Sequence, residues 1–120
     1  MTLEEIKEKS LPILLSNGAT FAAVFGSYSR HEERESSDVD ILVKFSPGIS
    51  LTKLIRIENR LSDVLKKKVD LVEEGGLEKS IQSSVYQNLN RETVWLTIQQ
   101  DIPHLKEHLS NINSEQKELN

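Results

Sequence analysis

Three aspartates interrupt two short apolar segments of this 120-residue chain. Asp38 and Asp40 open an apolar run that ends at Phe45, and Asp70 lies inside the segment Val69–Val72. Because residues two apart share one face of a strand, Asp38 and Asp40 are expected to project side by side. A buried carboxylate without a partner costs several kcal/mol or takes up a proton. A hard divalent cation such as Mg²⁺, which prefers oxygen ligands, would remove this cost for all three acids.

A Gly-Ser pair follows the apolar run Phe21–Phe25 and opens an expected polar turn of helix through Arg34. Backbone N–H groups at such a turn can bind an anion. Gly26 would let the backbone approach a ligand closely, and the Ser27 hydroxyl can donate to a phosphate oxygen. Arg30 can add a forked cationic contact. A phosphate-binding turn beside an acidic metal site predicts metal-assisted phosphoryl or nucleotidyl transfer.

Each of these features also has a purely structural explanation. Ser36-Ser37-Asp38 could be a turn with Asp38 at its exit. Asp70 could pair with a lysine at the end of the preceding helix, and a Gly-Ser pair after a strand is by itself a weak indication of phosphate binding. Their conjunction at this spacing favours the functional interpretation.

The hydrophobic pattern predicts the elements that must position these residues. Helices and strands alternate, which is typical of an α/β or α+β layer fold with a small mixed sheet flanked by helices. A capping-box spacing of Thr2 and Glu5 predicts the start of the first helix. The expected elements are a helix from Thr2 to near Asn17, a strand at 21–25, a strand at 38–45, a helix at 50–67, a strand at 69–72 and a helix at about 77–88.

The last part of the chain has a different pattern, with apolar residues at a/d-like spacing. This spacing predicts a helical seam that another surface must cover, either a partner or a second copy of the chain; its members are Trp95, Ile98, Ile102, Leu105, Leu109 and Ile112. We therefore divide the chain into a domain at 1–88 and a helical C-terminal extension at 89–120. His104 and His108 match the H-x-x-E-H pattern of inverted zinc proteases, but no third ligand is evident, and a solvated helix face is favoured.

The composition of the chain argues against several classes of protein and of binding site. The net charge of −4 argues against a protein that coats nucleic acid, and the single basic run, Lys66–Lys68, is interpreted as the solvated end of a helix. The absence of cysteine excludes disulfides and thiolate metal sites. No apolar stretch approaches the roughly 20 residues that a membrane span needs, so a soluble cytoplasmic protein is expected.

The three motifs together resemble those of the minimal nucleotidyltransferases of the DNA polymerase beta-like superfamily. The similarity covers residues 1 to about 88, and it implies the polymerase beta-like nucleotidyltransferase fold. The motifs are Gly26-Ser27-x-x-Arg30, Ser37-Asp38-x-Asp40-x-x-Val43 and Val69-Asp70-Leu71-Val72. His31 is a departure, because relatives usually carry glycine after the arginine.

The resemblance also implies roles for individual residues. Gly26 and Ser27 would hold the β- and γ-phosphates of ATP, with Arg30 and Ser37 as further nucleotide-binding residues. Asp38 and Asp40 would bind two Mg²⁺ ions. Asp70 would complete the second metal site and favour deprotonation of the acceptor hydroxyl.

Many minimal nucleotidyltransferases of this size are antitoxins. The resemblance therefore implies transfer of AMP from ATP to a tyrosine hydroxyl of a HEPN-type toxin, which is an RNase. The alternative is a non-catalytic antitoxin that neutralises its partner by complex formation through the C-terminal helix. The tail around 90–106 itself resembles the closing helix of HEPN toxins, and the toxins' RNase motif does not occur in this chain.

Overall fold

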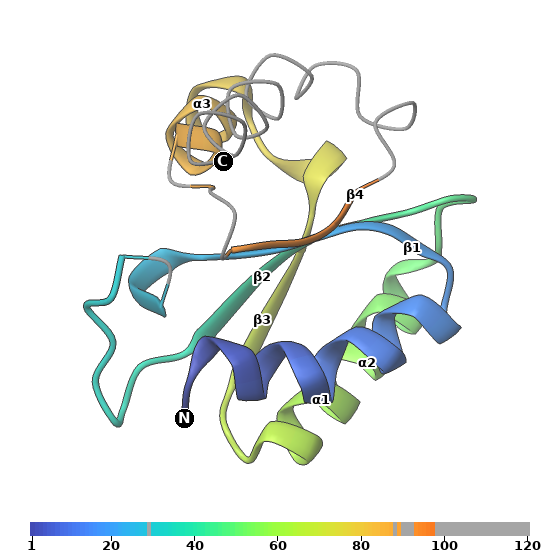
Figure 1. Ribbon diagram of the computed structural model, residues 1–120. Helices are drawn as coiled ribbons and strands as arrows, with labels where there is room; N and C mark the ends of the chain where they lie inside the picture. Colours follow the sequence, from blue (N-terminus) through green and yellow to red (C-terminus); the bar gives the residue numbers. More distant parts are fainter. Residues whose placement is uncertain (29, 88, 90–92, 98–120) are drawn as a thin grey trace, which may run out of the picture.

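The chain folds as a four-stranded sheet between two layers of helices (Figure 1). The computed structural model describes residues 1–28, 30–87, 89 and 93–97. Helices α1 (Leu3–Ser16) and α2 (Leu51–Leu65) lie on one face of the sheet, and α3 (Lys79–Gln87) lies over the other face. The strands are β1 (Ala19–Phe25), β2 (Val39–Phe45), β3 (Val69–Glu73) and β4 (Val94–Thr97), and short 3₁₀ helices follow β1 (η1, Gly26–Tyr28) and β3 (η2, Glu74–Gly76). The predicted mixed α/β architecture is confirmed.

The strand order β3-β2-β1-β4 places β2 between β1 and β3. Strand β1 runs antiparallel to β2 and to β4, whereas β2 and β3 are parallel and α2 forms the crossover between them. Asp40 is the register partner of Phe25 on one side and of Asp70 on the other. The carboxyl end of β1 therefore meets the amino ends of β2 and β3 at one end of the sheet.

The two long helices begin at side-chain caps. Thr2 Oγ1 accepts a hydrogen bond from Glu5 N at 3.1 Å, and Ser50 Oγ accepts one from Lys53 N at 3.2 Å. Such caps satisfy backbone donors that the first helical turn leaves free. Helix α2 ends at Lys66, which has a φ of 56° in the left-handed region.

Two hydrophobic clusters fill the spaces on the two faces of the sheet. Val39, Ile41 and Val43 of β2 belong to the cluster beneath α1 and α2, while Leu42 belongs to the cluster beneath α3. Since side chains alternate along a strand, Asp40 shares the face of Leu42. The prediction that Leu42 continues the face of Asp40 into the core is confirmed.

Helix α2 also covers the outer edge of β3, the strand at one end of the sheet. Leu71 N donates to Glu58 Oε2 at 2.8 Å, and Val69 N donates to Ser62 Oγ at 3.0 Å. The two acceptors are four residues apart on a helix and the two donors are two apart on a strand, so both spacings are near 6 Å. These side chains satisfy edge donors that would otherwise be open to pairing with another strand, and they fix the strand that carries Asp70.

Two of the sequence predictions are wrong. Trp95 lies in strand β4, which pairs with β1, and not in a helix. Val94, Trp95 and Thr97 are β-branched or aromatic, which favours a strand, so pairing with β1 overrides a weak helical spacing. The helix expected from Gly26 through Arg34 is only the three-residue η1, because the chain enters the left-handed region at His31 (φ 56°).

The rest of the predicted seam, together with His104 and His108, lies outside the described residues, and the division of the chain after residue 88 stays a prediction. Among the residues that the structure describes, no helix combines the length and the apolar character required to cross a bilayer.

Candidate active site

Asp40 and Asp70 form the centre of the site. They are register partners on neighbouring parallel strands, and their side chains share a hydrogen bond. The pKa of Asp40 is raised from 3.8 to about 6, mainly by burial and then by the charge and hydrogen bond of Asp70. The sequence predicted such close carboxylates for Asp38 and Asp40, whereas in the structure Asp70 has the larger effect on Asp40.

Gly26 packs directly against the Asp40 carboxyl group. Its φ of +74° lies in the left-handed region, which favours glycine. A Cβ at this position would overlap Asp40 Oδ2 and lie 3.1 Å from Asp40 Cγ. The Gly-Ser turn and the acidic strand are therefore parts of one site.

Asp38 is held differently from the other two aspartates. It precedes β2, and its Oδ2 lies 3.8 Å from Lys68 Nζ. Asp38 also raises the pKa of Asp40, but by less than Asp70 does. In the described part of the chain, no three acidic or histidine side chains come together as a ready metal-binding group. The lysine pairing that we considered for Asp70 occurs at Asp38 instead.

Arg30 is close enough to Asp40 for its charge to act on the carboxyl group. Its charge lowers the pKa of Asp40, against the larger effects of burial and of Asp70. Arg30 Nε donates to Glu32 Oε2 at 3.1 Å, and both side chains are substantially exposed. An incoming anion can therefore exchange with the Glu32 carboxylate for the arginine.

The loop after η1 is organised by local hydrogen bonds. The carbonyl of Ser27 accepts from Arg30 N at 3.2 Å and from Glu32 N at 2.9 Å. Ser37 Oγ accepts from Arg34 N at 2.8 Å, so its hydroxyl oxygen closes the turn that leads to Asp38. This is the turn that we weighed as the structural explanation, and a nucleotide contact by Ser37 stays a prediction.

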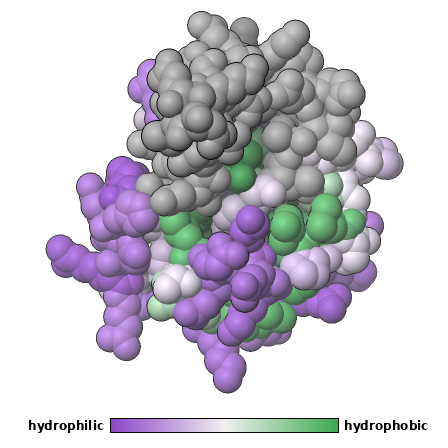
Figure 2. Space-filling view, viewed as in Figure 1, coloured by the Kyte–Doolittle hydropathy of each residue, from purple (hydrophilic) through white to green (hydrophobic). Residues whose placement is uncertain are grey.

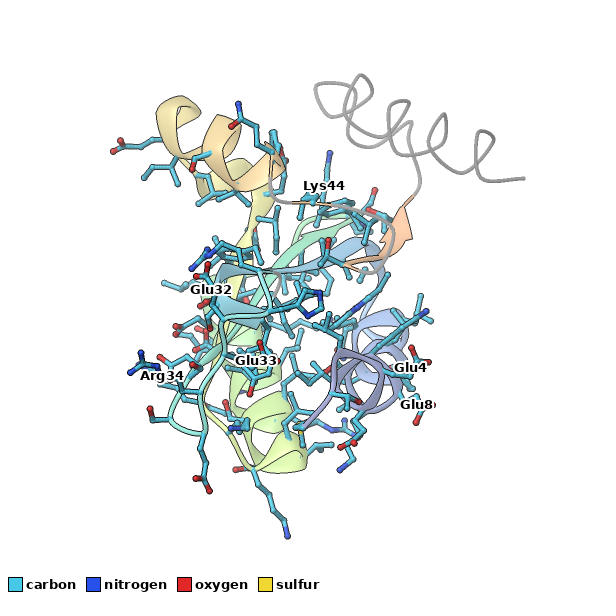
Figure 3. All side chains as sticks on the ribbon, turned by 60° about the vertical axis from the view of Figure 1, so that its left-hand side comes forward. Glu4, Glu8, Glu32, Glu33, Arg34 and Lys44 are labelled. Atoms are coloured by element: carbon cyan, nitrogen blue, oxygen red, sulfur yellow. The ribbon has the colours of Figure 1, made fainter. Side chains whose placement is uncertain are left out.

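The same loop forms one wall of an open cleft of about 770 Å³. The opposite wall is Lys66–Lys68, and Asp38 lies between the two walls. Lys67 Nζ donates to the Glu35 carbonyl oxygen at 2.8 Å and ties the walls together. Figure 3 shows Glu32 and Arg34 on the side of this loop away from α1, whereas Glu33 lies nearer to α1 and lines a second pocket together with Glu4. In Figure 2 hydrophilic side chains cover the left-hand side of the molecule, where this loop runs in Figure 1.

The polymerase beta nucleotidyltransferase family matches residues 8–94, which include every predicted site residue. The chain belongs to this family. Protein adenylyltransferase MntA of Thermococcus cleftensis is 38% identical to it over 104 residues, covering 80% of this chain and 97% of that protein. A candidate protein adenylyltransferase of Methanocaldococcus jannaschii is 50% identical over 72 residues, covering 60% of this chain and 77% of its own length.

Solved structures of toxin–antitoxin complexes share the fold of this nucleotidyltransferase. A chain of a toxin–antitoxin complex with AMP-PNP aligns with a TM-score of 0.69 and 22% identity, covering 93% of this chain and 90% of that chain. A chain of the complex between tri-AMPylated HEPN toxin and MNT antitoxin of Shewanella oneidensis aligns with a TM-score of 0.66 and 20% identity, covering 98% and 92%. At these identities the similarity establishes the fold.

The site of the nucleotidyltransferase has the donor chemistry that a divalent cation requires. The Asp40–Asp70 pair offers adjacent carboxylate oxygens, and the pKa of Asp40 is raised by burial first and by repulsion from Asp70 second, both of which a bound cation would offset. Asp38 is only half-buried and is bound by a single lysine, so its carboxylate can join the pair. The residues present therefore fit Mg²⁺.

Sequence reasoning missed two partners of the site residues. Lys68 was assigned to a solvated helix end, although it directly precedes β3 and faces Asp38. Glu32 was not singled out, and it pairs with Arg30. The position of Lys68 in the sequence could have revealed its contact with Asp38, because two parallel strands that start side by side bring the residues before them together.

Proposed function

We propose that this nucleotidyltransferase is an antitoxin that transfers AMP from ATP to a tyrosine hydroxyl of a HEPN-type RNase toxin. The observation that carries the proposal is the Asp40–Asp70 pair packed against Gly26. The similarity to MntA over nearly the whole length of that protein adenylyltransferase supports the class of reaction. The complexes with AMP-PNP and with AMPylated toxin, whose fold this chain shares, support ATP and a HEPN protein as its partners. The reaction would take place in the cytoplasm, which supplies ATP.

The phosphate-binding half of the site would consist of the turn after β1. Gly26 and Ser27 would hold the β- and γ-phosphates, and Arg30 would leave Glu32 to bind a phosphate oxygen, because an arginine–phosphate contact is strong when charge-assisted. Gly26 would serve twice, since its missing side chain also makes room for the Asp40 carboxyl.

The acidic half would hold the cation and the acceptor. Asp38, Asp40 and Asp70 would bind two Mg²⁺ ions, which when bound supply Lewis-acid stabilisation of phosphate charge and lower the pKa of the acceptor hydroxyl. Asp70 lies at the start of an edge strand, and Glu58 and Ser62 hold the backbone on either side of it through the N–H groups of Leu71 and Val69.

The proposed reaction is an in-line displacement at the α-phosphorus of ATP. The tyrosine oxygen forms a bond to this phosphorus while the bond to the bridging oxygen of the β-phosphate breaks. The hydroxyl proton moves to the Asp70 carboxylate, and pyrophosphate leaves with the electron pair of the broken bond. Positioning of the acceptor against the α-phosphorus would supply much of the rate.

Labelled AMP transfer tests this proposal. The full chain is incubated with ATP labelled at the α-phosphate, Mg²⁺ and the HEPN-type protein encoded beside it. We expect label on the HEPN protein, located on a tyrosine by mass spectrometry. Asp40→Asn should abolish transfer, because it removes a carboxylate from the centre of the site.

Asp63→Asn is the matched control. Asp63 is exposed on α2, on the opposite face of the sheet from Asp40, and the substitution makes the same chemical change. It should leave transfer intact. Labelling that survives Asp40→Asn, or no labelling by the wild-type chain, would refute the proposed activity.

A further inference from the structure

Lys68 connects the third aspartate to the strand that carries Asp70. Its Nζ lies 3.8 Å from Asp38 Oδ2, and the two side chains are 70% and 42% exposed. The backbone joins the same place, because Val39 N donates to the Lys68 carbonyl oxygen at 2.9 Å. Lys68 and Asp38 are thus neighbours where the two parallel strands begin.

The other two aspartates interact with each other. Asp40 and Asp70 share a hydrogen bond, and Asp38 affects Asp40 more weakly than Asp70 does. In the described residues the three carboxylates do not form a ready cation-binding group. Asp38 instead forms an exposed ion pair with Lys68.

We propose that Lys68 is a positioning residue that acts as the counter-ion of Asp38 until a divalent cation binds the Asp38 carboxylate. The inference rests on the proposed function for the role of the three aspartates and adds a role for the lysine. Three neighbouring carboxylates repel one another when no cation is bound, and one ammonium group at their edge reduces this repulsion. An exposed ion pair contributes little free energy, so a cation can displace Lys68 readily.

The two neighbouring lysines differ from Lys68 in their contacts. Lys67 donates to the Glu35 carbonyl oxygen and fixes the wall of the cleft. Lys66 is exposed at the end of α2. Lys66→Gln therefore makes the same charge change as Lys68→Gln close to the same site, without removing the contact with Asp38, and it serves as the matched control.

The test is a titration of the full chain with Mn²⁺, followed by the loss of the free-ion electron paramagnetic resonance signal, without nucleotide or acceptor. Lys68→Gln should tighten Mn²⁺ binding about three- to fivefold, which is the size expected of one exposed charge near 4 Å. Lys66→Gln should change it by less than about 1.5-fold because screening weakens a more distant charge. Lys68→Arg should restore the wild-type affinity, and thermal unfolding of each variant verifies that it is folded.

A second readout is the Mg²⁺ dependence of AMP transfer. Lys68→Gln should lower the apparent KM for Mg²⁺ by a similar factor with kcat unchanged, a split that a loss of folding would not produce.

Equal Mn²⁺ affinity in Lys68→Gln and Lys66→Gln would overturn the role of Lys68 even if AMP transfer is normal. A selective gain in Lys68→Gln would support it even if the wild-type chain transferred no AMP, an outcome that would refute only the proposed activity. A wild-type chain that binds no Mn²⁺ would overturn the inference as well.

Discussion

Gly26 lies so close to Asp40 that any side chain at position 26 would collide with the Asp40 carboxyl group. The left-handed φ of Gly26 adds a backbone cost for any other residue, about 1–2 kcal/mol. The sequence pattern assigns Gly26 to phosphate binding, and in the structure Gly26 also packs against the strand that carries Asp40. The phosphate half and the acidic half of the site cannot be altered independently at this position.

Gly26→Ala is predicted to reduce AMP transfer about 100-fold, because the new Cβ displaces the Asp40 carboxyl and misplaced catalytic groups lose rate steeply. Gly48→Ala is the control, since nothing lies within 4 Å of a Cβ added there. Steady-state transfer rates of the two variants check this. Equal rates for Gly26→Ala and Gly48→Ala would contradict the close packing.

Asp40→Asn is predicted to stabilise the protein at pH 7 while it abolishes transfer. The pKa of Asp40 is about 6 in the folded chain and 3.8 in the reference state. Between these values the folded chain holds a proton that the unfolded chain has released, so the free energy of unfolding falls as the pH rises through this window. Asparagine cannot ionise, and the gain is about 1–2 kcal/mol after a discount for partial exposure. Urea unfolding should show this gain at pH 7 and none below about pH 4.

Mg²⁺ binding is predicted to weaken in acid. A cation must displace the proton that Asp40 holds below pH about 6, so the apparent affinity should fall by up to about tenfold per pH unit below that value. Above pH 7 the affinity should be nearly independent of pH. Calorimetric Mg²⁺ titrations from pH 5 to 8 check the curve, and a flat profile across this range would rule out Asp40 as a ligand.

Tyr86→Phe is predicted to destabilise the fold by about 1–3 kcal/mol. Tyr86 Oη donates to Glu74 Oε1, a carboxylate that is only 2% exposed, at 2.5 Å, and burial together with this carboxylate raises the pKa of Tyr86. The contact fastens α3 to η2, the 3₁₀ helix that follows β3. The double variant Glu74→Leu, Tyr86→Phe should lose less than the sum of the single variants, and additive losses in chemical denaturation would show that the two groups are not coupled.

Lys66→Gly is predicted to raise the stability by about 0.5–1 kcal/mol, because Lys66 adopts the left-handed conformation that glycine favours at a helix end. A calorimetric Tm higher by about 2–5 °C is expected. The next residue, Lys67, lacks the positive φ, so Lys67→Gly should give no gain. A lower Tm for Lys66→Gly would show that the lysine stabilises the helix end in another way.

Several features of the site could be predicted because they are local in the sequence. The apolar runs around Asp40 and Asp70 predict their strands, and the capping box of Thr2 and Glu5 predicts the start of the first helix. The family resemblance implies glycine at the position of His31, and the φ of 56° there lies in the left-handed region that favours glycine.

Other features depend on contacts between distant segments. The pairing of Asp38 with Lys68, the Glu74–Tyr86 hydrogen bond and the edge contact from Glu58 to β3 join residues that no short pattern relates. Trp95 was predicted in a helix because its spacing is helical, but the pairing of its segment with strand β1 decides its conformation.

The most direct measurement of the central claim is the RNase activity of the HEPN-type partner after incubation with this chain and Mg²⁺. ATP is compared with α,β-methylene ATP, whose bond at the α-phosphorus cannot be broken by the proposed displacement. The account predicts that ATP silences the partner, that the silencing persists after this chain is removed, and that the analogue has no lasting effect. Equal silencing with the analogue, or with Asp40→Asn, would contradict catalysis and indicate neutralisation by binding alone.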